Sequence, residues 1–295
     1  MINKKLEQKR LGIFLSLTFA LTWIPWIIFN KAFGYEEWFE SGHLSILTAL
    51  SSYGPALANI LTRWITREGW KDSMLHLRLK GNLKYYVIAL MMPIMYGLLI
   101  GILITCRYGE WDMSKMLMSG SWQSNLAWIL NILVIAPLMA FNTFGEEFGW
   151  RAYMNQKMEP LLGTVGTCVI GGIIWGVWHA PLTVCGHNYG IDYPGFPYLG
   201  ILLMSVVCIF DGIILMWLTK KTGSIYPAAI MHAMNNNGGP EIGNLLIMGV
   251  PENMEMTIWD QLYMGIPQII LGVIFLILML HDKNKEKVRK IETEN

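Results

Sequence analysis

Charge is scarce in this sequence. Asp, Glu, Lys and Arg make up only 15% of the 295 residues, and 54% are hydrophobic, whereas an average soluble protein is about 25% charged. The formal net charge is +1, so no basic excess indicates a nucleic-acid partner. The composition therefore excludes an ordinary soluble domain and predicts a multi-pass protein of the lipid bilayer.

The sequence also has few cysteines, no HExxH metal motif and no low-complexity linker. The four cysteines lie in or at the ends of apolar segments without CxxC spacing, which predicts free, buried thiols. The sequence has no HExxH motif, so a zinc site built from two histidines of one helix is excluded. Neither a low-complexity linker nor an internal repeat divides the chain, and we predict a single integral membrane domain over residues 1–295.

Long apolar runs predict an all-α, polytopic membrane helix bundle with about eight transmembrane helices. The expected spans are residues 11–29, 44–65, 85–106, 126–144, 164–180, 198–218, a seventh from 226, and an eighth from about 258 to 280. The fourth helix is expected to continue to about Met158, and Pro160 with Gly163 marks the turn that follows it. The seventh span is too polar to face lipid and should lie inside the bundle.

The positive charges predict the orientation of this bundle. With eight spans, every Lys and Arg except Lys31, Arg107 and Lys115 falls on the side that carries the N-terminus. Cytoplasmic loops of membrane proteins are enriched in Lys and Arg. Both termini are therefore expected in the cytoplasm, an N-in and C-in arrangement.

The sequence Gly145–Arg151 places two glutamates and an arginine directly after an uncharged apolar run. Ionisable groups at membrane depth usually line functional cavities. Glu147 and Arg151 are four residues apart on one helical face, which predicts a structural ion pair and leaves Glu146 available for chemistry. Asp211, midway along the sixth span, is expected to form a hydrogen bond to a neighbouring helix, with a place in the cavity as the alternative.

Two further polar pairs occur at helical spacing, Trp175 with His179 and His232 with Asn236. Because the fourth and fifth spans are joined by a turn, Glu146 and His179 should reach a similar depth, and His232 should also lie near the middle of the membrane. We therefore expect these side chains to converge.

A Glu and a His around one water molecule suit hydrolysis, because they can remove a proton from the attacking water and return it to the leaving amine. A second His and an amide could donate hydrogen bonds to an oxyanion. Two His and one Glu could instead hold zinc, and the residues alone leave that alternative open. A non-catalytic membrane protein that uses the cavity for binding, such as an immunity or transport factor, is a third possibility.

The three motifs together resemble those of one family. Residues 125–240 contain, in order, EExxxR (Glu146, Glu147, Arg151), a match to FxxxH (Trp175, His179) and HxxxN (His232, Asn236). This pattern is similar to that of the CPBP family of intramembrane endopeptidases, also called Abi proteins, type II CAAX prenyl proteases or bacteriocin-processing enzymes. Trp175 replaces the usual Phe, an aromatic exchange expected to leave the surroundings of His179 similar.

The resemblance implies an eight-helix fold and a set of roles. Glu146 and His179 would activate water, and His232 with Asn236 would form the oxyanion site. It also implies a glutamate mechanism without a cofactor, with zinc as the less favoured alternative. The substrate would be a membrane-associated peptide or membrane protein, in CAAX-type processing or in bacteriocin maturation or immunity, and the location would be the bacterial cytoplasmic membrane.

Overall fold

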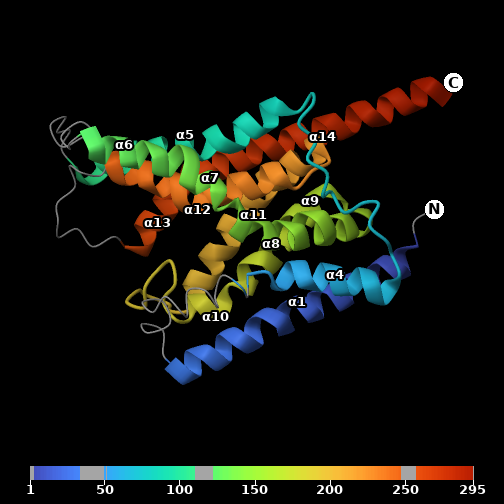
Figure 1. Ribbon diagram of the computed structural model, residues 1–295, viewed down its shortest axis with the longest axis horizontal. Helices are drawn as coiled ribbons and strands as arrows, with labels where there is room; N and C mark the ends of the chain where they lie inside the picture. Colours follow the sequence, from blue (N-terminus) through green and yellow to red (C-terminus); the bar gives the residue numbers. More distant parts are fainter. Residues whose placement is uncertain (1–2, 34–49, 51, 110–121, 247–256, 295) are drawn as a thin grey trace.

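The computed structural model describes residues 3–33, 50, 52–109, 122–246 and 257–294, and these residues form helices and no strand. Figure 1 shows the helices gathered in one elongated bundle. In chain order the helices are α1 (Lys4–Phe33), α4 (Gly54–Thr66), α5 (Leu83–Tyr108), α6 (Trp122–Leu130), η1 (Asn131–Ile135), α7 (Ala136–Leu138), α8 (Ala140–Gly149), η2 (Trp150–Met154), α9 (Asn155–Trp178), α10 (Ala180–Thr183), α11 (Tyr198–Thr222), α12 (Tyr226–Leu246), α13 (Ile258–Met264) and α14 (Ile266–Glu294). The all-α prediction is confirmed.

Five helical stretches of the described chain are long and apolar enough to cross a membrane. They are Lys4–Ala32, Leu83–Tyr108, Ala140–Trp178, Tyr198–Thr222 and Ile266–Lys285. The chain is therefore a polytopic membrane helix bundle. The count of eight stays a prediction, because the start of the expected second span, residues 44–49, lies outside the described residues.

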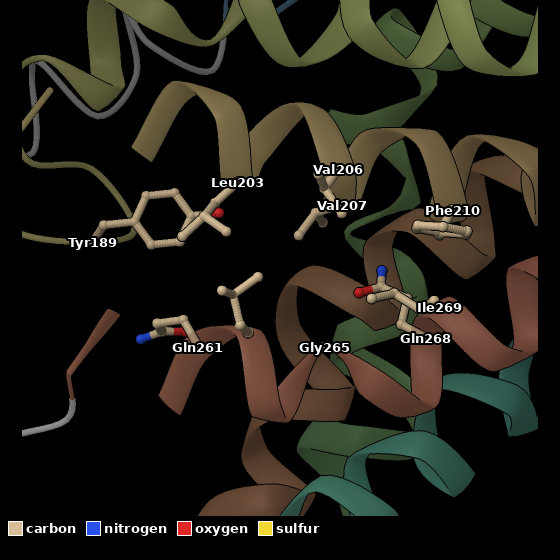
Figure 2. A pocket seen from close by; sticks show the side chains of 10 residues that line it. Tyr189, Leu203, Val206, Val207, Phe210, Gln261, Gly265, Gln268 and Ile269 are labelled. Atoms are coloured by element: carbon tan, nitrogen blue, oxygen red, sulfur yellow. The ribbon is translucent and has the colours of Figure 1, made fainter. Parts of the chain in front are cut away.

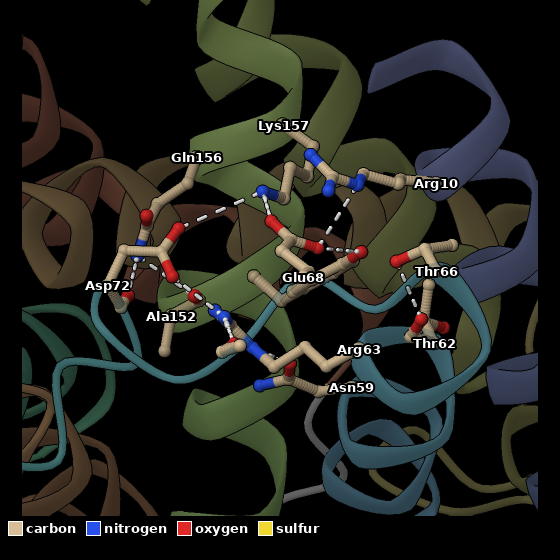
Figure 3. Close-up of polar contacts among 12 residues, drawn as sticks. Arg10, Asn59, Thr62, Arg63, Thr66, Glu68, Asp72, Ala152, Gln156 and Lys157 are labelled. Carbon is tan, nitrogen blue, oxygen red and sulfur yellow. Dashed lines mark hydrogen bonds and ion pairs between the residues drawn. The ribbon is translucent and has the colours of Figure 1, made fainter. Parts of the chain in front are cut away.

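Both ends of the chain lie at the same end of the bundle (Figure 1), as an even number of spans requires. The polar connection between α4 and α5 is anchored at this end by a charge cluster, shown in Figure 3. Glu68 pairs with Lys157 of α9 and, at 3.3 Å, with Arg10 of α1. Asp72 pairs with Arg63 of α4 at 2.7 Å. Which side of the membrane carries this cluster stays a prediction.

The expected continuous helix from Leu126 to Met158 was wrong in detail. The segment changes to π-helix over Asn131–Ile135, turns at Met139, and becomes π-helical again in η2. Pro137 accounts for the first break, because proline lacks the N–H and its ring crowds the preceding turn of helix. The turn after this segment was predicted correctly: Gly163 leaves helical geometry with φ 72° and ψ 175°.

The eighth span also begins later than expected. The helix that starts at Ile258 ends at Met264, and α14 starts at Ile266 after a break at Gly265. Pro267 is the second residue of α14, where the missing N–H costs little, so the local sequence favours a new helix start.

All four cysteines are free thiols, as predicted. Cys168, Cys185 and Cys208 are buried, whereas Cys106 is exposed, so the expectation of burial was wrong for that residue. Apolar neighbours along the chain do not ensure burial in a membrane helix, because lipid tails are as apolar as a protein core.

Glycines bring α9 and α11 into direct backbone contact. A Cβ atom on Gly172 would lie 2.4 Å from the Cα of Ile209, and one on Gly176 would lie 2.3 Å from the Cα of Ser205. Small residues permit such close helix approach in membranes. This contact holds the end of α9, which carries His179, against the middle of α11.

Tryptophans form the apolar base beneath that end of α9. The ring of Trp178 lies 4.8 Å from that of Trp26 in α1 and 5.8 Å from that of Trp150 in η2, measured between centroids. The indole of Trp23 donates a hydrogen bond of 2.9 Å to the carbonyl of Trp178. These contacts join α1, η2 and α9 below the site.

Candidate active site

One cavity of about 460 Å³ lies among α8, α9, α11 and α12. The structure brings Glu146, His179, His232 and Asn236 together in its wall. Its full lining is Trp26, Ser52, Glu146, Trp175, Trp178, His179, Leu182, His187, Asn188, Met204, Val207, Cys208, Asp211, His232, Asn235 and Asn236. Residues from separate elements of the sequence therefore meet at one place, as the depth argument predicted.

Glu146 lies on α8 with 8% of its surface exposed. Its Oε2 accepts a hydrogen bond of 2.8 Å from the indole N–H of Trp175. No Lys or Arg nitrogen of the described chain comes within 4 Å of this carboxylate. Glu146 is thus oriented by a neutral donor and remains free of a cationic partner.

Trp175 is more than an aromatic stand-in for Phe. Its indole orients Glu146, and its ring receives the guanidinium of Arg151, whose Cζ lies 4.3 Å from the centroid. A phenylalanine could pack in the same place but has no N–H to donate. The expectation that this exchange changes little was therefore incomplete.

Glu147 is fully buried behind the cavity wall. The predicted ion pair is present, with Arg151 Nε 3.2 Å from Glu147 Oε2. The other carboxylate oxygen, Oε1, lies 3.0 Å from Nδ1 of His232, a contact that the sequence did not predict. Glu147 therefore links the arginine on one side to a cavity histidine on the other.

The packing of α8 against α12 makes this contact possible. Thr143, one turn before Glu147, donates a hydrogen bond of 2.7 Å to the carbonyl of Ala229. Ala229 lies one turn before His232 on α12. The hydrogen bond thus fixes the two helices in the register that places the carboxylate beside the imidazole.

His179 follows the last residue of α9, and its Nδ1 lies 3.0 Å from the carbonyl oxygen of Trp175. A carbonyl can only accept, so Nδ1 carries the proton and, in the neutral ring, Nε2 keeps a free lone pair. The ring of Trp178 packs edge-on against the imidazole, with centroids 4.7 Å apart. His179 is thereby held in a tautomer that can act as a base.

Asn236 lies one turn after His232 on α12 and is exposed to the cavity. Within the described chain its side-chain amide has no hydrogen-bond partner. Its N–H groups are therefore available to a ligand. The nitrogen Nε2 of His232 likewise has no hydrogen-bond partner among the described residues, whereas Nδ1 contacts Glu147.

Several cavity residues were not predicted. Asn235 of α12 donates a hydrogen bond to Asp211. It is one of three consecutive asparagines, and the sequence alone did not show which of them would contact Asp211. His187 and Asn188 come from the loop after α10, where burial lowers the pKa of His187. Asp211 meets both expectations stated for it, since it bonds to a neighbouring helix and lines the cavity.

A second, smaller groove adjoins the cavity and shares Val207 with it. Figure 2 shows it between α11 and the start of α14, with the amide of Gln268 directed towards α11. Its other lining residues are Tyr189, Leu203, Val206, Phe210, Gln261, Leu262, Gly265 and Ile269. Apolar side chains dominate this groove.

No group of three His, Cys, Asp or Glu side chains among the described residues is arranged to ligate one metal ion.

Comparison with known proteins places the chain among membrane proteases. The profile of the type II CAAX prenyl endopeptidase Rce1-like family matches residues 122–238, which include all three motifs. CAAX prenyl protease 2 of Methanococcus maripaludis is 28% identical over 234 residues, which cover 74% of this chain and 80% of that protein.

Lysostaphin resistance protein A of Staphylococcus haemolyticus is 27% identical over 154 residues, and that of Staphylococcus epidermidis is 27% identical over 178 residues. The matched regions cover only 35% and 40% of those two proteins. Taken with the helical membrane fold, the profile match and the similarity to a CAAX prenyl protease support a membrane endopeptidase of the CPBP family.

Proposed function

We propose that this protein hydrolyses peptide bonds of membrane-associated peptides or membrane proteins, using water activated by Glu146 and His179. The observation that carries the proposal is the convergence of these residues with His232 and Asn236 on one cavity. Such a set provides a base, an acid and oxyanion donors, the three functions that amide hydrolysis requires.

Glu146 is the proposed general base and acid. It takes the proton from water as the oxygen attacks the carbonyl carbon, and it returns that proton to the amine nitrogen as the C–N bond breaks. His179 accepts a hydrogen bond from the same water through Nε2, because Nδ1 is occupied by the carbonyl of Trp175. The two groups thus orient one water molecule from different helices.

Asn236 and His232 are the proposed oxyanion donors. The amide of Asn236 supplies an N–H without any change of charge. His232 supplies one from Nε2 when its ring is doubly protonated, and the Glu147 carboxylate at Nδ1 balances that positive charge. Glu147 and Arg151 are therefore positioning residues, because they act through His232 and Trp175.

The cavity wall also supports an apolar substrate. Trp26, Trp178, Leu182 and Met204 line it beside the polar groups. We propose processing of a CAAX-type protein or maturation of a bacteriocin-like peptide, in the bacterial cytoplasmic membrane. The name of the CAAX prenyl protease supports the first alternative, and the names of the two lysostaphin resistance proteins fit the related immunity role.

The experiment that tests the function compares the membrane and secreted peptidomes of cells that carry the wild-type chain or Glu146→Ala. A peptidase leaves a set of cleaved termini that disappears with the variant while the inserted protein persists. Identical peptidomes of the two kinds of cell would favour the non-catalytic binding role instead.

We also propose that catalysis is metal-free. It is supported by the arrangement of the described His, Cys, Asp and Glu side chains, no three of which could hold one metal ion. Protein purified without chelator is expected to contain zinc well below one atom per chain and to keep its activity after dialysis against a chelator. Stoichiometric zinc, lost together with activity when His179 or His232 is replaced, would establish the metalloprotease alternative.

The hydrogen bond from Trp175 to Glu146 leads to a separate prediction. Trp175→Phe is expected to lower kcat by roughly 10- to 100-fold with little change in KM, because a hydrogen bond to a charged group contributes about 1.5–3 kcal/mol. Trp217→Phe is the matched control, since the buried indole of Trp217 has no hydrogen-bond partner in the described chain. A Trp175→Phe enzyme as fast as wild type would show that the indole does not orient the base.

A further inference from the structure

Asp211 is a second carboxylate in the cavity, and the proposed hydrolysis does not use it. It lies midway along α11 with 8% of its surface exposed, one turn after Cys208, which lines the same cavity. A carboxylate costs free energy at such a position unless it is paired or hydrogen-bonded. The groups around Asp211 therefore show whether its charge is balanced within the protein or is available to a ligand.

The described partners of Asp211 are neutral amides. Asn235 of α12 donates a hydrogen bond of 3.1 Å to Oδ1, and the side-chain amide of Gln268 of α14 interacts with the same carboxylate. Asn235 is itself held by the hydroxyl of Tyr96 on α5. Figure 2 shows Gln268 reaching from α14 towards α11, the helix to which Asp211 belongs. The carboxylate is thus fixed in position by residues of three other helices.

Asp211 forms no ion pair within the described part of the chain. The cavity lining includes two carboxylates and three histidines but neither Lys nor Arg, and no basic nitrogen of the described residues lies within 4 Å of Asp211. Arg151 is a buried cation that could balance the charge of Asp211, but its guanidinium pairs with Glu147 and stacks on the ring of Trp175. Apart from its imidazoles, the cavity lining of the described residues therefore has two carboxylates and no basic side chain, and the charge of a protonated His232 is already balanced by Glu147.

Hydrogen bonding between helices does not by itself require a charge at this position. An asparagine at 211 would still offer an oxygen to Asn235. A carboxylate adds a negative charge, which is stabilising only when a positive group enters the cavity, because the low dielectric there strengthens their attraction.

We infer that Asp211 is a specificity residue that binds the ammonium or guanidinium of a Lys or Arg side chain of the substrate, held at a fixed distance from the peptide bond that is hydrolysed beside Glu146. The inference rests on the proposed peptidase function and adds a substrate class to it. Asn235 and Gln268 act as positioning residues that orient the carboxylate.

The test uses full-length protein in lipid nanodiscs and a library of peptides of mixed sequence, with cleavage sites identified by mass spectrometry. Wild type is expected to cleave sites that carry Lys or Arg at one constant position. Acetylation removes the charge of lysine, so the Lys-containing sites of the same library should be cleaved roughly tenfold or more slowly after acetylation, the effect of losing one charge-assisted hydrogen bond. This comparison needs no variant to fold.

Variants then locate the effect. Asp211→Asn should lose the basic preference while it still cleaves neutral sites, and Asp211→Glu should retain the preference. Asp282→Asn is the matched control, because Asp282 pairs with Lys221 outside the cavity. Equal cleavage of native and acetylated peptides by wild type, or an unchanged preference in Asp211→Asn, would overturn the inference alone. Absence of any Glu146-dependent cleavage would overturn the proposed function and the inference with it.

Discussion

Glu146→Gln is expected to abolish turnover, with a fall in kcat of at least roughly 10²–10⁴-fold, the usual contribution of a general acid–base group. Glutamine keeps the shape of the side chain and can still accept the hydrogen bond from Trp175. It cannot take a proton from water. The substitution should therefore leave folding and membrane insertion intact while it removes the chemical step.

The measurement is cleavage rate per folded molecule, with the amount of inserted protein determined separately. Glu159→Gln is the matched control, because Glu159 lies near the other end of α9 and contacts Lys220 and Thr164 rather than the cavity. It should cleave at nearly the wild-type rate. A Glu146→Gln protein that cleaves as fast as wild type would remove Glu146 as the base.

Relations within one helix were predictable from the sequence. The Glu147–Arg151 ion pair depends only on a spacing of four residues, and the structure contains it. The turn at Gly163 was equally local, because glycine readily adopts the positive φ found there. The hairpin that follows from this turn brings Glu146 and the end of α9 into the same cavity.

Relations between helices were not predictable in the same way. His232 and Glu147 are 85 residues apart, and their contact depends on how α8 and α12 are rotated and shifted against each other. The bond from Trp175 to Glu146 also depends on a side-chain rotamer, so the motif showed an aromatic ring but not its hydrogen bond. The choice of Asn235 over its neighbours as the partner of Asp211 has the same cause.

Breaks in helices were only partly predictable from the sequence. The irregular geometry around Pro137 and the new helix start near Pro267 follow from the missing proline N–H, yet the apolar runs suggested continuous spans. Hydropathy measures compatibility with lipid, and it does not report whether the backbone inside an apolar segment is regular.

Glu147→Gln is expected to act differently from Glu146→Gln, although the two glutamates are adjacent. The carboxylate of Glu147 is fully buried and is shared by Arg151 and His232. Removing it leaves the Arg151 guanidinium buried without its counter-ion, and loss of one partner of a buried pair costs about 3–5 kcal/mol of unfolding free energy. The variant should therefore show a large drop in stability and abundance.

A double-mutant cycle separates this stability effect from catalysis. Glu147→Gln and Arg151→Gln should each destabilise the protein, and the double variant should lose less than the sum because neither member of the Glu147–Arg151 pair is left without the other. Activity per folded molecule should fall in Glu147→Gln through His232, but by less than in Glu146→Gln, because an amide oxygen can still accept the Nδ1 proton of His232. If Glu147→Gln instead folds normally and is inactive while Glu146→Gln retains activity, the roles of the two carboxylates are reversed.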